Sequence, residues 1–151
     1  MKPVYLSDQG VGAQLFPFTL MRPVADIRVG ILTIREKWAL LLNQSVQLLP
    51  AEEAGMTAAA ATLIPANILP SRRFVAGLDI SGGAIPANPD DDRIRVLRYP
   101  WHLFQYNDWA LREDFALLTH NRVSAPVPAG VQAINPAAVF IEEGARLSHC
   151  I

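Results

Sequence analysis

The expected fold class is α/β, and three local patterns in the sequence are compatible with it. Residues 3–7 have the composition of a short first strand, and a loop with two glycines follows at residues 8–12. Further along, Thr33-Ile34-Arg35-Glu36 has the pattern of a capping box, in which a threonine hydroxyl and a glutamate carboxylate cap the first turn of a helix. A strand, a loop and then a helix are compatible with an α/β fold.

The spacing of apolar residues predicts the elements of the first half. A helix is expected over residues 34–43, because Ile34, Trp38 and Leu41 or Leu42 recur at helical spacing. The other expected segments are a strand at 46–49, a short helix at 51–61, two apolar segments at 62–65 and 67–70, a strand at 74–80 and a loop at 81–92.

The second half is predicted to begin with a half-buried strand at 93–99, in which arginines alternate with Ile94 and Val96. An aromatic segment at 101–106 is expected to start a docking helix. Asn107 is then the expected N-cap of a helix over 108–118. The apolar stripe of that helix is interpreted as core; it consists of Trp109, Leu111, Phe115 and Leu118.

Composition excludes several classes of protein. The 151 residues are 51% hydrophobic and 18% charged, which is typical of a folded domain. A net charge of −1 argues against a nucleic-acid partner, and the lack of a long apolar run argues against a membrane partner. The single cysteine, Cys150, excludes an intramolecular disulfide framework and a cysteine-rich zinc site. We expect a cytoplasmic protein.

A six-residue pattern near the C-terminus indicates a different architecture there. Residues 141–146 show an aliphatic residue, an acidic residue and a small residue at the spacing of hexapeptide repeats, and Leu147 restarts the pattern. Such repeats build parallel β-helices. The predicted organisation is therefore an α/β domain at 1–120, then a linker and the first repeat of a truncated left-handed β-helix at 121–151. Its open edge predicts a homo-oligomer.

The glycine loop belongs to a longer signature. Residues 10–24 resemble the signature of sugar-phosphate nucleotidylyltransferases, Gly-x-Gly-Thr-Arg-Leu-x-Pro-Leu-Thr followed three residues later by Pro-Lys. The matching positions are Gly10, Gly12, Leu15, Pro17, Thr19 and Pro23. Gln14 replaces the arginine of the signature and Val24 replaces its lysine.

A second resemblance covers most of the chain. The segments at 16–38, 65–70, 100–107, 114–115 and 141–145 resemble, in order, a divergent bacterial group of bifunctional N-acetylglucosamine-1-phosphate uridylyltransferase/glucosamine-1-phosphate acetyltransferase-like proteins. In that group a nucleotidylyltransferase-like region precedes a left-handed β-helix acyltransferase. The resemblance implies a small, Rossmann-like, mainly parallel sheet with flanking helices.

This resemblance implies a site. Gly10, Gly12 and Gln14 would approach the nucleotide, UTP or a UDP-sugar, and a sugar 1-phosphate would be the second substrate. Arg22 and Arg28 would be the catalytic, phosphate-facing cations, and Asp26 a ligand of Mg²⁺. The alternative for these three residues is an ion-pair network among themselves. Because Gln14 and Val24 are neutral, the sequence predicts little uridylyl transfer by this chain.

One alternative function stays open, and another is disfavoured. The domain is either part of an enzyme or a non-catalytic nucleotide-sugar-binding or oligomerisation module that orients the β-helix. Dinucleotide binding is disfavoured because the third glycine of that fingerprint falls at Leu15. The acids at 90–92 are read as turn residues, and His102 as a packing or surface residue.

Overall fold

The computed structural model describes residues 2–49, 61–80, 83–85, 88 and 90–148. It forms two compact units, residues 1–117 and 118–151. The first unit is an α/β fold, as the sequence predicts. The helix expected over 51–61 lies almost wholly outside the described residues.

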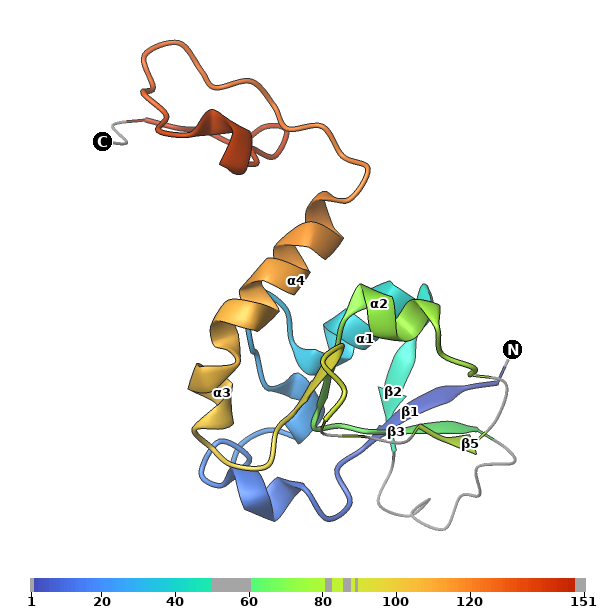
Figure 1. The fold of residues 1–151 in the computed structure, drawn as a ribbon. Helices are drawn as coiled ribbons and strands as arrows, with labels where there is room; N and C mark the ends of the chain where they lie inside the picture. Colours follow the sequence, from blue (N-terminus) through green and yellow to red (C-terminus); the bar gives the residue numbers. More distant parts are fainter. Residues whose placement is uncertain (1, 50–60, 81–82, 86–87, 89, 149–151) are drawn as a thin grey trace. The chain divides into compact units, whose positions relative to one another are not determined.

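A four-stranded parallel sheet forms the centre of the first unit (Figure 1). Its strand order is β2-β1-β3-β5, with β1 at Val4–Ser7, β2 at Val46–Leu48, β3 at Thr62–Pro65 and β5 at Gly83–Ala84. Strand β1 pairs with β2 through Val4 and Val46, and with β3 through Val4 and Thr62. The chain thus leaves β1 towards one neighbour and later returns on its other side. Strand β5 lies where the composition predicted only loop.

Helix α1, Ile34–Leu42, begins with the predicted capping box. The Thr33 hydroxyl accepts a hydrogen bond from the Glu36 amide, and the Glu36 carboxylate accepts one from the Thr33 amide. Ile34 and Trp38 are fully buried, and the Trp38 indole donates to the Ile68 carbonyl at 3.1 Å. The helix ends at Asn43, which adopts a left-handed conformation.

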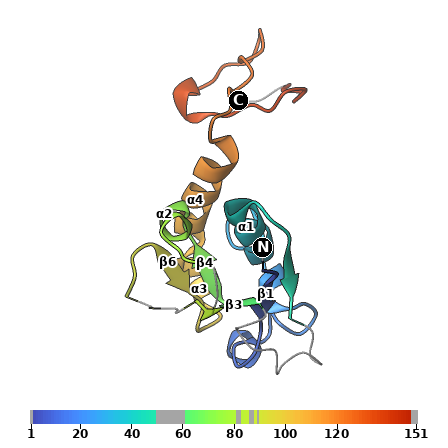
Figure 2. The same ribbon diagram turned by 90° about the vertical axis from the view of Figure 1, so that its right-hand side faces the viewer.

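A second, antiparallel sheet pairs β4, Ile68–Pro70, with β6, Ile94–Val96. The strand expected over 74–80 is wrong: the chain forms α2, Arg72–Ala76, instead. Ser71 starts this helix by accepting a hydrogen bond from the Phe74 amide at 3.2 Å. Both views place α1 and α2 on the same side of the parallel sheet (Figures 1 and 2).

The aromatic segment forms a short helix, α3, His102–Gln105, and α4 follows at Asn107–Thr119. The predicted apolar stripe of α4 is wrong in part, because Leu111 is 40% and Phe115 44% exposed. The residues that α4 buries are Ala110 and Asp114. Nor does Asn107 cap its own helix: its Oδ1 accepts a hydrogen bond from the Gly30 amide at 2.9 Å.

The described part of the second unit forms no β-helix. Residues 120–148 contain one 3₁₀ turn, Pro136–Ala138, and no strand. The aliphatic residue of the predicted repeat, Ile141, is buried. Its amide donates to the Ser124 hydroxyl, and its carbonyl accepts a hydrogen bond from the Ala125 amide. An ion pair joins Arg122 to Glu142. A single repeat has no neighbouring coil on which to stack, so its sequence pattern alone does not produce a coil.

Candidate functional site

The glycine loop follows β1 directly and begins at the carboxyl edge of the parallel sheet, as predicted. Gly10 adopts φ +75°, which allows the chain to turn sharply after the strand. A 3₁₀ helix, η1, begins at Gly12 and ends at Leu15. The Thr19 hydroxyl donates to the Gly12 carbonyl at 2.8 Å, and the Gln14 amide donates to the Gly10 carbonyl at 3.2 Å. Gln14 therefore helps to close the loop and does not supply the positive charge of the signature's arginine.

A cavity of about 580 Å³ opens beside this loop. Its lining residues are Val11, Gln14, Asn67, Arg98 and Tyr99. In open parallel sheets, ligands bind outside the carboxyl ends of the strands, where the strand order reverses direction. Here the strand order reverses between β1 and β3. The loop after β1 supplies one side of this position, and Asn67, two residues beyond the end of β3, supplies the other. The cavity is thus where this fold class places a ligand.

Sequence reasoning missed three residues of this cavity. Asn67 is buried and donates to the Leu97 carbonyl at 2.8 Å, which fixes the segment carrying Arg98 and Tyr99. Within the described residues, the Arg98 guanidinium has no hydrogen-bond or ion-pair partner. Tyr99 is 50% exposed and stacks on Trp101, with ring centres 4.6 Å apart. The position of Asn67 just beyond a strand end was the available signal.

Position 24, which carries lysine in the signature, lies in the hydrophobic core. Val24 lies in a 3₁₀ turn, Val24–Asp26, and its side chain is fully buried. The Val24 amide donates to Asp8 Oδ2 at 2.9 Å. Burial raises the pKa of Asp8, and its other oxygen, Oδ1, is buried without a hydrogen-bond partner in the described structure. A cation at position 24 would have to enter the hydrophobic core.

Asp26 is engaged by an arginine that the sequence did not suggest. Its Oδ1 lies 2.7 Å from the Arg35 guanidinium, whereas the expected partners were Arg22 and Arg28. No three His, Cys, Asp or Glu side chains among the described residues gather into a metal-binding group. With its carboxylate paired and no second ligand set among the described residues, Asp26 does not fit a resident metal ion.

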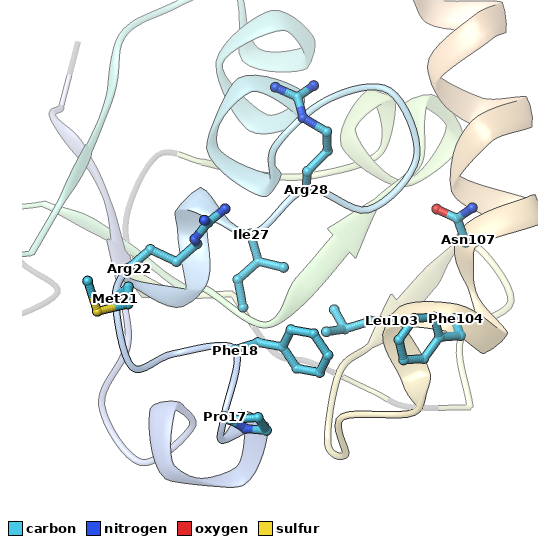
Figure 3. A pocket seen from close by; sticks show the side chains of 9 residues that line it. All are labelled: Pro17, Phe18, Met21, Arg22, Ile27, Arg28, Leu103, Phe104 and Asn107. Carbon is cyan, nitrogen blue, oxygen red and sulfur yellow. The ribbon is translucent and has the colours of Figure 1, made fainter.

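The two predicted catalytic arginines line a different cavity, of about 630 Å³ (Figure 3). Arg28 donates to the Ile31 carbonyl and lies 4.0 Å from the Glu36 carboxylate. Arg22 is exposed and has no hydrogen-bond or ion-pair partner among the described residues. Neither arginine lines the cavity beside the glycine loop. The structure therefore separates residues that the sequence had grouped in one site.

Fold and site together define an α/β protein with a cavity at the carboxyl edge of a parallel sheet. The chain belongs to the sugar nucleotidyl transferase family, whose model matches residues 4–85. Family membership implies a nucleoside triphosphate and a sugar phosphate as substrates, and members typically depend on Mg²⁺. No curated protein and no solved structure matches the chain. Among the described residues, no helix has the length and apolar character needed to cross a membrane.

Proposed function

We propose that this chain is the N-terminal domain of a sugar-1-phosphate nucleotidylyltransferase/hexapeptide acyltransferase-like protein, and that it binds UTP or a UDP-sugar beside the glycine loop. The observation that carries the proposal is the cavity formed by Val11, Gln14, Asn67, Arg98 and Tyr99 at the carboxyl edge of the sheet. Family membership supports the substrate class. The identity of the base and the sugar follows from the resemblance to the uridylyltransferases.

Each side of the cavity offers one kind of contact to a nucleotide. The turn at Gly10–Gly12 brings backbone close to a phosphate group, since neither glycine has another residue within 4 Å of the position of a Cβ atom. Arg98 supplies a cation that has no partner in the described protein. The exposed ring of Tyr99, held by its stack on Trp101, offers a flat surface for a base.

The proposed reaction is uridylyl transfer. A phosphate oxygen of N-acetylglucosamine 1-phosphate attacks the α-phosphorus of UTP, and the bond from that phosphorus to the β-phosphate oxygen breaks, releasing pyrophosphate. Mg²⁺ would arrive with the triphosphate, whose oxygens are its usual ligands. Because Gln14 is bound to its own loop and Val24 is buried, we expect the chain to bind the nucleotide with little turnover.

The loop-bound Gln14 and the buried Val24 also favour a second candidate function. This candidate is a non-catalytic module that binds a nucleotide sugar or mediates self-association of the longer protein. With neutral residues at positions 14 and 24, Arg98 is the one cation among the described residues that line the cavity. A single cation suits binding of a diphosphate better than stabilisation of a transferring triphosphate. The two candidates share the cavity and differ in turnover.

The test combines binding and turnover. Calorimetric titration with UTP and with UDP-N-acetylglucosamine, each with Mg²⁺, should show binding that weakens about tenfold in Tyr99→Ala and in Arg98→Ala. Arg146→Ala, which removes an exposed arginine of the second unit, is the matched control. Unchanged affinity in both cavity variants would overturn the site.

Turnover is measured as pyrophosphate release from UTP and N-acetylglucosamine 1-phosphate with Mg²⁺. Release close to background, together with nucleotide binding, would select the non-catalytic module. Robust release that disappears in Arg22→Ala would show that this arginine supplies the charge missing from positions 14 and 24.

A further inference from the structure

The cavity that contains Arg22 has an apolar wall that projects into solvent. Phe18 and Phe104 meet edge to face, with ring centres 6.1 Å apart, and Leu103 lies beside them (Figure 3). Phe104 is 73% exposed, although it belongs to a folded helix. Two exposed aromatic rings in contact with each other offer a surface on which a flat apolar group could stack.

The cavity also contains charged side chains, and these are arginines. Arg22 and Arg28 line it, and no acidic residue is among its described lining residues. The Arg22 guanidinium is free of protein partners in the part of the chain that the structure describes. Asn107 also lines the cavity, and its Oδ1 accepts a hydrogen bond from the Gly30 amide. The arginines complement an anion.

We propose that this cavity is a second ligand site, which takes an organic phosphate with an aromatic body. The aromatic part would lie against Phe18 and Phe104, and the phosphate would bind Arg22. A volume of about 630 Å³ lies within the range of small-molecule pockets. Three of its lining residues, Leu103, Phe104 and Asn107, lie outside the family match at 4–85. No described lining residue is shared with the cavity beside the glycine loop, so the site is distinct from the proposed nucleotide cavity.

The probe for this site is 1-naphthyl phosphate, titrated against the full chain and followed by calorimetry. We expect it to bind at least tenfold more tightly than 1-naphthol or inorganic phosphate, because each of those carries half of the recognition. Arg22→Ala and Phe104→Ala should each weaken binding about tenfold. Both side chains are exposed, so thermal melts of the variants should match the parent. Arg146→Ala and Phe115→Ala are the matched controls.

Testing the probe of one cavity against a variant of the other distinguishes the two sites. Tyr99→Ala should leave the affinity for 1-naphthyl phosphate unchanged, and saturating UTP should not displace the probe. Absence of binding, equal affinity for naphthol, or equal losses in Arg22→Ala and Arg146→Ala would overturn the proposal. Displacement by UTP would also overturn it, because the probe would then report the nucleotide's own site.

Discussion

Lys37 of α1 and Asp114 of α4 form a buried ion pair, in which the lysine ammonium contacts both carboxylate oxygens. Each side chain is only 3% exposed. The same carboxylate accepts hydrogen bonds from the amides of Ile31 and Leu32, at 2.8 and 3.0 Å. Burial lowers the pKa of Lys37 even though the carboxylate opposes that shift. Asp114 thus joins α4 to α1 and to the loop that precedes α1.

Removing this carboxylate should destabilise the fold strongly. Asp114→Ala leaves the Lys37 ammonium buried without a counterion and two amides without an acceptor, and we expect a loss of about 3–5 kcal/mol in urea unfolding. Arg112→Ala is the control, since it breaks the exposed Arg112–Asp108 pair on the same helix and should barely move the unfolding midpoint. Equal midpoints for the two variants would contradict the structural role of the buried pair.

Gly30 should tolerate no side chain. It adopts φ +81°, and a Cβ atom there would lie 2.6 Å from Asp114 Oδ2 and 2.9 Å from the Ala110 carbonyl carbon. Gly30→Ala is expected to cost more than roughly 2 kcal/mol, because steric overlap adds to the backbone strain. Gly10→Ala, at φ +75° with no atom within 4 Å, isolates the backbone term. It should cost about 1 kcal/mol in the same unfolding measurement. A smaller loss at Gly30 than at Gly10 would refute the close approach of α4.

The capping box predicts a pH dependence. Hydrogen bonds from the Thr33 amide and hydroxyl lower the pKa of Glu36 below its usual 4.5. A carboxyl whose pKa is lower in the folded state stabilises the fold above pH 4.5, and this contribution disappears as the pH falls and Glu36 is protonated. Glu36→Gln should therefore lower the melting temperature at pH 7, and the difference from the parent should shrink by pH 3.

Thr33→Ala provides the companion measurement. We expect this variant to lose about 1 kcal/mol in the free energy of unfolding, because the hydroxyl acceptor of the cap is missing. If Glu36→Gln and the parent differ equally at both pH values, the carboxylate does not act through its charge.

Positions 14 and 24 should respond differently to restoration of the family's cations. Gln14 is exposed, so Gln14→Arg is expected to fold normally and to tighten UTP binding about tenfold in calorimetry. Val24 is fully buried, so Val24→Lys should cost at least about 2 kcal/mol. Val24→Ile is the control for added volume without charge. A fully stable Val24→Lys variant would show that this position can reach solvent.

Local sequence patterns determined the parts of the fold that depend on neighbouring residues. The capping box at Thr33 and Glu36, the turn at Gly10 and the first strand all follow from groups within a few positions of one another. The α2 error has the same local basis: the apolar character of residues 74–80 suggested a strand, while the cap at Ser71 was overlooked.

Only the tertiary structure decided which distant residues meet. Lys37 and Asp114 are 77 positions apart, and neither side chain carries a local sign that it will be buried. The division of the expected site has the same cause, because the path of the chain after the loop places Val24 in the core and Arg22 in the cavity that Phe104 also lines. Spacing fixes the neighbours of a residue along the chain, whereas its chemical role depends on what packs against it from elsewhere.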